Sequence, residues 1–293
     1  MTTLGFLGLG RMGTAIAGRL LAAGLPVSVW NRSDSAAAQG LVDAGAQRAA
    51  SAADALAAPV SFSMLADDTA ADEVLSAENL GRTDVQRIHV NMASISAAMA
   101  DVLASRFADA GVRYVSAPVL GRPEVAAQGK LNVLLAGPAE ALDVVDSYLV
   151  HCSVRRWRFG ETPRQANAVK IAVNFMILQS LESLGESIAL VESQDVDASQ
   201  FVELIGASLF GGVVHTGYGA IIAERRYTPP GFTVALGRKD LGLAEELAAE
   251  GRVDVPMADV LRERFETALA DPDLAALDWS AVAEVSRRSV GRA

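Results

Sequence analysis

The sequence predicts an α/β amino-terminal domain built on a doubly wound sheet, followed by an all-helical carboxy-terminal domain. A glycine-rich turn joins an apolar strand to a helix near the start of the chain. Strand-like and helical runs then alternate to about residue 160, and beyond it the apolar spacing stays near 3.6 residues without a convincing strand. With 293 residues, 51% of them hydrophobic, the chain is large enough to bury two cores.

The first element is a short apolar strand from Leu4 that runs into a turn with the G-x-G-x-x-G spacing of a dinucleotide-binding loop. Gly8 permits the tight turn, Gly10 lets the backbone approach a pyrophosphate, and Gly13 lets the helix pack on the strand. The helix amino terminus then directs N–H groups at the phosphates. The other residues of this predicted cofactor cradle are Leu9, Arg11 and Met12.

Glycine spacing alone is a weak signal in a chain with 25 glycines, but its context strengthens the prediction. A helical run from Thr14 to Ala23 ends at Gly24, and Pro26 to Trp30 has the pattern of a second strand. The βαβ unit has about the expected ~30 residues. The sequence therefore predicts a dinucleotide-binding unit.

The residues after the second strand indicate which dinucleotide is bound. An Asp or Glu there accepts from the ribose 2′-hydroxyl of NAD, whereas an Arg accommodates the 2′-phosphate of NADP. This chain has Asn31, Arg32 and Ser33. A guanidinium binds phosphate as a fork and the two neutral residues add donors, so the prediction is NADP(H). Asp34 is interpreted as capping or beginning the next helix, from Ser35 to Val42.

The remaining strands and the long helix follow from the same patterns. Further strands are predicted at Val60 to Leu65, Ile88 to Met92, Tyr114 to Val119, Leu131 to Ala136 and Val154 to Phe159. The segment from Pro163 to about Ser193 has no internal proline and is predicted to form one long helix. The domain boundary is placed near Gly160, which gives an NADP-binding domain over 1–160 and a helical substrate and dimerisation domain over 161–293.

Charge and cysteine content exclude several classes of protein. A net charge of −10 and a pI near 4.8 argue against a nucleic-acid surface, so local groups must hold an anionic cofactor. The single cysteine, Cys152, cannot form an internal disulfide, and no His/Cys cluster predicts a metal site. Without a signal-peptide pattern or a sufficiently long apolar run, we expect a cytoplasmic protein with a small-molecule substrate and no membrane partner.

Lys170 and Asn174 lie four residues apart in the predicted long helix, so both side chains occupy one face. The surrounding residues of this segment are largely apolar. The lysine is therefore either a surface residue on a narrow polar stripe or a proton donor.

The order of motifs along the chain resembles the β-hydroxyacid dehydrogenase family, to which 6-phosphogluconate dehydrogenases and imine reductases are related. These motifs are Gly8 to Gly13, Asn31-Arg32-Ser33, Met64-Leu65, Ala93-Ser94-Ile95-Ser96, Ser116 to Val119, Gly129-Lys130-Leu131, Lys170 with Asn174, and Lys239-Asp240-Leu241. The resemblance covers nearly the whole chain. It implies a Rossmann-type domain, a long interdomain helix, and a homodimer or homotetramer whose active site is completed near the subunit interface.

The resemblance also implies roles for individual residues. The lysine matching Lys170 is the general acid in carbonyl reduction, and the asparagine matching Asn174 holds the substrate. An ammonium within reach of the carbonyl oxygen both stabilises and protonates it. To act as a base near neutral pH, the lysine needs a dry setting that lowers its pKa, which its apolar neighbours can supply. Cofactor-lining positions are matched by Met64, Leu65, Ser94 and Lys239, and Ser94 also borders the substrate.

One departure from the family affects the predicted substrate site. Where the family has D-A-P-V-S-G-G, this chain has Ser116 to Val119 followed by Leu120, Gly121 and Arg122. The hydroxyl that binds the substrate carboxylate in the family is missing. Arg122 can replace it with a bidentate grip, or Leu120 makes the pocket apolar while Arg122 faces solvent or cofactor. A second departure is Asn91, where an aspartate is common.

These features lead to a main function hypothesis and two alternatives. The main one is an NADPH-dependent reductase of a small aldehyde or keto acid, with Lys170 as proton donor. The second is an imine reductase, which suits an apolar Leu120 pocket but not a cationic lysine beside an iminium. The third is a nucleotide-binding regulator without turnover, against which Lys170, Asn174 and Lys239 together argue.

Overall fold

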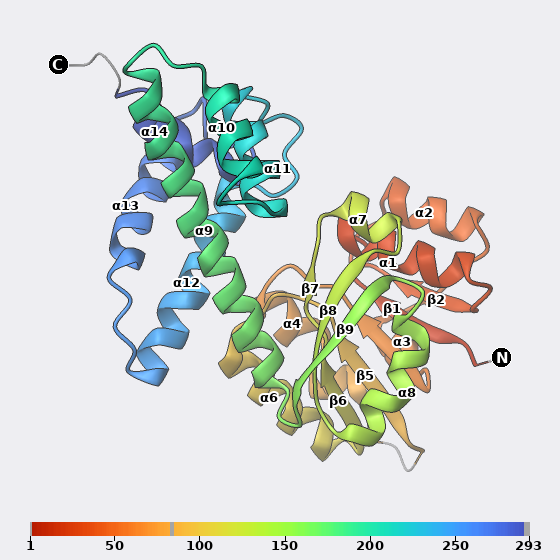
Figure 1. Cartoon of the computed structure of the whole chain (residues 1–293). Coiled ribbons are helices and arrows are strands. Elements are labelled where there is room, and N and C mark those ends of the chain that lie inside the picture. Colours follow the sequence, from red (N-terminus) through yellow and green to blue (C-terminus); the bar gives the residue numbers. More distant parts are fainter. Residues whose placement is uncertain (1, 83–84, 290–293) are drawn as a thin grey trace. The chain divides into compact units, whose positions relative to one another are not determined.

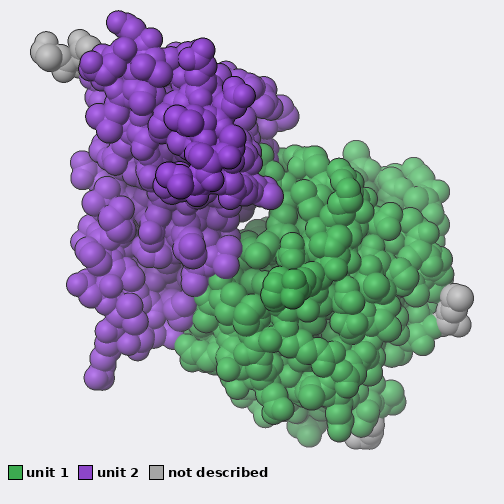
Figure 2. Space-filling model, in the orientation of Figure 1, with its two compact units in different colours: residues 1–170 green, residues 171–293 purple. Residues whose placement is uncertain are grey.

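The computed structural model of the chain describes residues 2–82 and 85–289. It divides into two compact units, residues 1–170 and 171–293 (Figure 2). The division falls within α9 (Arg164–Glu192), a single helix of 29 residues (Figure 1). The predicted long helix is therefore confirmed.

The first unit contains one sheet with the strand order β3-β2-β1-β4-β5-β6-β8-β7, in which β9 also pairs with β8. The strands are β1 (Leu4–Leu7), β2 (Val27–Trp30), β3 (Gln47–Arg48), β4 (Val60–Ser63), β5 (Arg87–Asn91), β6 (Val112–Ser116), β7 (Val119–Leu120), β8 (Leu131–Ala136) and β9 (Ser153–Gly160). All pairs from β3 to β6 are parallel. The strand order reverses between β1 and β4, and in such sheets ligands bind at the carboxyl ends of the strands at this switch point.

Helices of the first unit cover both faces of the sheet. They are α1 (Arg11–Ala22), α2 (Ala36–Asp43), α3 (Ala52–Leu56), α4 (Asp68–Val74), α5 (Ala77–Leu80), α6 (Ala97–Asp109), α7 (Pro123–Ala127) and α8 (Ala139–Leu149). One core holds apolar residues of α1, α2, α7 and α8, and another holds those of α3 to α6. The predicted doubly wound α/β architecture is confirmed.

The second unit is helical. After the rest of α9 it contains α10 (Ala198–Ala207), α11 (Val213–Ala223), α12 (Val234–Gly251), α13 (Met257–Ala270), the 3₁₀ helix η1 (Trp279–Val282) and α14 (Ala283–Arg287). Its core includes Leu181, Leu241, Phe265 and Trp279. Gly237 allows α12 and α13 to approach closely, because a Cβ at this position would lie 2.5 Å from the Phe265 ring. Among the described helices, none combines the length and apolar character that crossing a bilayer requires.

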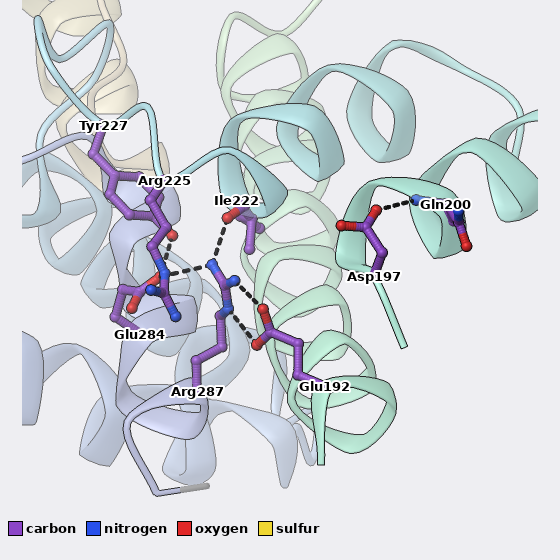
Figure 3. A network of polar contacts seen from close by, with 8 residues as sticks. All are labelled: Glu192, Asp197, Gln200, Ile222, Arg225, Tyr227, Glu284 and Arg287. Atoms are coloured by element: carbon purple, nitrogen blue, oxygen red, sulfur yellow. Dashed lines mark hydrogen bonds and ion pairs between the residues drawn. The ribbon is translucent and has the colours of Figure 1, made fainter. Parts of the chain in front are cut away.

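A buried arginine fastens the end of the second unit (Figure 3). Arg287 donates to both oxygens of the Glu192 carboxylate, to the Ile222 carbonyl oxygen at 2.5 Å and to Glu284 at 2.9 Å. Glu284 also accepts from the Tyr227 hydroxyl at 2.7 Å. Because the donors of a buried guanidinium must be satisfied, this network ties α14 to the ends of α9 and α11.

Candidate active site

The three glycines of the predicted nucleotide loop meet different local constraints. Gly8 has a φ of +89°, and a Cβ there would lie 2.4 Å from the Met64 carbonyl oxygen. A Cβ at Gly13 would lie 2.0 Å from the Gly8 carbonyl oxygen. By contrast, a Cβ at Gly10 would meet nothing within 4 Å. Gly8 and Gly13 are therefore required by the fold, whereas Gly10 leaves open the space that a pyrophosphate needs.

The open space beside Gly10 lies at the amino terminus of α1. Gly10 is the N-cap of this helix and has no side chain to cap it, and the first turn contains no acidic residue. The N–H groups and the positive end of the helix dipole therefore favour an anion. These residues fit the pyrophosphate of a dinucleotide.

Asn31 shapes this loop from the end of β2. Its Oδ1 accepts from the Leu9 backbone N–H at 2.9 Å, and its Nδ2 donates to the Ser33 carbonyl oxygen at 2.8 Å. Both the oxygen and the nitrogen of the carboxamide therefore form hydrogen bonds with backbone atoms. The side chain braces the glycine loop, a contact that the sequence did not reveal.

Arg32 extends from the same strand end, with 76% of its side chain exposed, and it pairs with Glu73 of α4 at 3.2 Å. Asp34 forms an ion pair with Arg48 of β3. The N-cap of α2 is Ser35, whose hydroxyl accepts from the Ala38 N–H at 3.1 Å. The interpretation of Asp34 as cap or first residue of α2 is therefore wrong, because the shorter serine side chain already fills that position.

The turns after β4 and β5 carry the next predicted residues. Met64 and Leu65 are half-buried after β4, and a Leu65 methyl group would lie 3.1 Å from a Cβ placed on Gly8. Leu65 thus lies against the glycine loop. Ser94 is half-buried between β5 and α6, and Asn91 fixes this turn by accepting from the Ala93 N–H at 3.0 Å. Both turns leave the carboxyl ends of parallel strands at the switch-point edge.

The segment that departs from the family pattern lies near the glycine loop. It runs from β7 into α7, and α7 packs on α1, where Glu124 pairs with Arg11 at 3.1 Å. Gly121 has a φ of +140°, and the half-buried Arg122 is the N-cap of α7. Leu120 packs in a small apolar cluster with residues of β8 and α9.

Lys170 is half-buried and is the last residue of the first unit. The helical turns that precede it are fastened to that unit at two points. Asn167 donates to the Ile95 carbonyl oxygen at 3.3 Å, and Arg164 pairs with Asp101 of α6 at 2.6 Å. The helical turn that precedes the lysine is therefore attached to the loop that contains Ser94. Asn167 was not predicted, although its position three residues before Lys170 on one helix face was a usable signal.

The second unit holds the other predicted residues. Asn174, one turn after Lys170 on α9, is buried and donates from Nδ2 to Oδ2 of Asp240 at 2.5 Å. Lys239 lies on α12 with its Nζ 3.5 Å from Oδ1 of Asp240. Since a carboxylate only accepts, the Asn174 amide nitrogen must face Asp240, and its oxygen faces away from that carboxylate. Asp240, which belongs to a motif but had no predicted role, thus joins Asn174 and Lys239.

His89 is a buried titratable group that does not belong to the site. It lies on β5 with its ring nitrogens 2.8 and 2.9 Å from the hydroxyls of Ser61 and Ser63, and its ring stacks on Phe107. Burial lowers its pKa to about 3, so the imidazole is neutral at physiological pH. It is a core residue rather than a proton donor.

The class of protein follows from three features of the first unit: a glycine loop at the switch point, a helix amino terminus that can bind phosphate, and a lysine. Together they define an oxidoreductase that depends on a nicotinamide dinucleotide. Such a cofactor donates or accepts a hydride. Lysine can supply the matching proton.

Comparison with known proteins supports this class. Residues 3–158 match the family described as the NAD binding domain of 6-phosphogluconate dehydrogenase. Residues 165–286 match the family described as NAD-binding of NADP-dependent 3-hydroxyisobutyrate dehydrogenase.

Relatives match along almost the entire chain. The uncharacterized oxidoreductase YfjR of Bacillus subtilis is 37% identical, covering 94% of this chain and 96% of that protein. The chloroplastic glyoxylate/succinic semialdehyde reductase 2 of Arabidopsis thaliana is 28% identical, covering 98% and 81%. The solved structure of Mycobacterium tuberculosis 3-hydroxyisobutyrate dehydrogenase with L-serine shares the fold, with a TM-score of 0.87 and 24% identity over 98% of this chain and 99% of that one. The chain belongs to the β-hydroxyacid dehydrogenase family and is an oxidoreductase.

Proposed function

We propose that this protein is an NADPH-dependent reductase that converts a small aldehyde or keto acid to the hydroxy acid, or catalyses the reverse reaction. The observation that carries the proposal is that the Lys170 turn and the glycine loop belong to one compact unit. The proton donor and the groups that bind the cofactor thus belong to the same compact unit. The name of the Arabidopsis relative, a glyoxylate/succinic semialdehyde reductase, supports the substrate class.

The residues have separate tasks in this reaction. The bound cofactor supplies the hydride. Backbone N–H groups of the glycine loop and α1 would hold the pyrophosphate, and Met64, Leu65 and Ser94, in the turns at the switch-point edge, would border the cofactor. The Lys170 ammonium donates to the carbonyl oxygen, stabilises the negative charge that develops there and transfers its proton. Lys239 is assigned to cofactor binding because it matches the cofactor-binding lysine of the family.

The preference for NADPH over NADH rests on the end of β2. Arg32 is the cation there, and the nearest carboxylate in sequence, Asp34, is paired with Arg48. The Arg32 pair with Glu73 is exposed on both sides and therefore weak, so a dianionic phosphate can replace the carboxylate. Asn31 contributes by bracing the loop, and Ser33 adds a neutral donor.

Substrate binding is assigned to Leu120, Gly121 and Arg122 with Ser94 and Asn174. The orientation of the Asn174 amide offers an oxygen as acceptor, which suits a hydroxyl or an ammonium rather than a carboxylate. A carboxylate on the substrate is therefore assigned to Arg122, whose guanidinium can bind it as a fork.

An imine reductase is the second candidate function. The observation that favours it is Leu120, an apolar side chain where the family pattern places serine. Lys170 counts against it, because a cation beside an iminium is unfavourable.

We further propose a homodimer or homotetramer. Four large apolar side chains at the α10–α11 corner of the second unit are at least half exposed: Leu204, Leu209, Phe210 and Val213. A second copy of the chain would remove this patch from water.

The experiment that tests the function is NADPH oxidation with glyoxylate, succinic semialdehyde, an uncharged aldehyde and a cyclic imine, each repeated with NADH. We expect turnover of the two acids, with NADPH preferred. Turnover of the imine alone would support the second candidate. NADPH binding without turnover of any substrate in the panel would instead support a regulator.

A further inference from the structure

Arg48 ends β3 at the same edge of the sheet as the predicted cofactor residues that follow β2. The two strands are parallel with Val29 opposite Arg48, and the Ala49 N–H donates to the Val29 carbonyl oxygen at 3.0 Å. The carboxyl ends of parallel strands share one edge, where α/β sheets bind their ligands. Arg48 therefore lies beside the loop that continues from Val29 through Arg32 and Ser33.

The guanidinium of Arg48 has one partner in this loop and another on the following helix. Its Nη1 pairs with Oδ1 of Asp34, and its Nη2 donates to Oε1 of Gln39 at 3.1 Å. Gln39 is held in turn by Asp43, one turn further along α2, to which its Nε2 donates at 2.8 Å. Since the amide nitrogen faces Asp43, the amide oxygen is the end that faces Arg48. The helix therefore positions the arginine independently of Asp34.

Asp34 is the partner that a ligand can displace. Its side chain is 91% exposed, against 46% for Arg48. An exposed ion pair contributes little net free energy, because water already solvates both charges and two side chains must be ordered. A phosphate group carries more negative charge than a carboxylate and accepts two N–H groups of a guanidinium as a fork. A phosphate at this place therefore competes with Asp34 for Arg48.

The surface is hollowed beside this ion pair. The hollow has a volume of about 570 Å³, which is ample for a phosphate group, and it is open to solvent. Its lining is polar except for one alanine: Asp34, Ser35, Ala36, Gln39 and Arg48. Such a lining suits a hydrated anion, and the hollow gives that anion access to the guanidinium.

Two arginines flank the loop between β2 and α2. Arg32 pairs with Glu73 of α4, whereas Arg48 is held by Gln39 of α2. Ser33, which follows Arg32 in the chain, is exposed. A phosphate bound at Ser33 can therefore receive donors from both arginines. In a chain with a net charge of −10, such local cations must supply the attraction for an anion.

We propose that Arg48 is a second cation of the site for the 2′-phosphate of NADPH, and that Asp34 is the internal competitor that this phosphate displaces. NADH has a hydroxyl group at the same place, which leaves the ion pair of Asp34 with Arg48 intact. Arg48 thus adds to the affinity for NADPH alone. The inference rests on the proposed preference for NADPH and extends the specificity site from β2 to β3.

Binding of two nucleotides tests the proposal without turnover. Adenosine 2′,5′-bisphosphate and adenosine 5′-monophosphate differ only by the 2′-phosphate, and their Kd values are measured on the full chain by isothermal titration calorimetry. Arg48→Ala should weaken binding of the bisphosphate about 10-fold or more and leave binding of the monophosphate unchanged. Arg155→Ala is the matched control, because it removes an exposed arginine, stacked on Trp157, from β9. It should change neither Kd.

Variants of Asp34 separate direct binding from mere neutralisation of charge. Asp34→Asn removes the competitor and should tighten binding of the bisphosphate several-fold. Adding Arg48→Ala to Asp34→Asn should then weaken it about 10-fold or more, because the cation itself binds the phosphate. If Arg48 only neutralised Asp34, the double variant would bind the bisphosphate as tightly as Asp34→Asn, and that result would overturn the proposal.

Two further variants keep the test decisive. If Arg48→Ala lowers the Tm so far that binding cannot be measured, Arg48→Gln replaces it with the same expected loss. Arg48→Lys retains the charge but not the fork and should lose only part of the affinity.

Failure of this proposal and failure of the proposed cofactor preference give different results. Equal affinity of the wild type for both nucleotides would overturn the preference for NADPH and this proposal with it. A wild-type preference for the bisphosphate that survives Arg48→Ala would overturn this proposal alone.

Discussion

Replacing Gly10 with alanine should separate cofactor binding from folding. A Cβ at Gly10 meets nothing within 4 Å, and the residue has an extended backbone (φ −67°, ψ −177°) that alanine also adopts. Alanine is a poorer N-cap than glycine, but it also restricts the unfolded chain, so the free energy of unfolding should change by less than about 1 kcal/mol. The methyl group would nevertheless occupy the space where the pyrophosphate approaches the backbone.

Gly13→Ala should behave in the opposite way. Its Cβ would lie 2.0 Å from the Gly8 carbonyl oxygen, whereas ordinary van der Waals contacts of this kind begin at 3.4 Å. The helix must move by more than an ångström, and overpacking of this kind costs about 1–3 kcal/mol or more. In a domain of this size, each kcal/mol lowers the Tm by about 2–4 °C.

The assay compares Tm without ligand and the Kd for NADPH by fluorescence titration. We expect Gly10→Ala to keep the Tm and to weaken NADPH binding about 100-fold, which corresponds to about 2.8 kcal/mol. Gly40→Ala, on the exposed side of α2 with nothing within 4 Å, is the matched control and should alter neither binding nor the fold. Undiminished NADPH binding by Gly10→Ala would refute the placement of the pyrophosphate.

Three further predictions concern arginines. Arg32→Ala should raise KM for NADPH at least 10-fold and change KM for NADH little, whereas Glu73→Gln should lower KM for NADPH. Equal effects of Arg32→Ala on both cofactors would contradict the assignment of Arg32 to the 2′-phosphate. Arg122→Leu should lower kcat/KM for keto and semialdehyde acids but spare uncharged aldehydes, and indifference to substrate charge would exclude the proposed grip. Arg287→Met should lower the free energy of unfolding by about 3–5 kcal/mol in urea titrations, because it leaves the half-buried Glu192 carboxylate without Arg287 and removes one of the donors to buried Glu284. Hydrogen bonds from Arg287 hold the pKa of Glu192 below its ordinary value. The stabilisation by this pair is therefore complete when the pH is above the ordinary pKa and is lost as the pH falls through the lowered pKa. If Arg287→Met lost the same free energy of unfolding above the ordinary pKa and below the lowered one, this explanation would be contradicted.

The sequence was informative wherever structure is determined locally. The glycine spacing and the alternation of apolar runs predicted the order of β1, α1 and β2 and the long helix, because glycine geometry and hydrophobic periodicity act over a few residues. The two-residue strand β3 was not predicted, and the strand predicted from Tyr114 to Val119 is divided between β6 and the two-residue β7, since so short a segment carries no periodicity.

Partnerships across the chain were harder to predict because they depend on tertiary placement. Asn31 looked like a phosphate donor, but its carboxamide braces the glycine loop. Asp240 was part of a motif without a role, and the structure places it against Asn174, 66 residues earlier in the chain. Asn167 was overlooked because the sequence shows its spacing to Lys170 but not its partner, the Ile95 carbonyl oxygen.

The most direct test of the account is to compare the wild type with Lys170→Met in NADPH-dependent reduction of glyoxylate and succinic semialdehyde, with the Kd for NADPH measured in parallel. If Lys170 is the proton donor, kcat should fall by about 10²–10⁴ while NADPH binds almost as tightly as before, because the lysine supplies the proton and not the cofactor site. Near-normal turnover by Lys170→Met would contradict it and identify the lysine as a surface residue on a polar stripe.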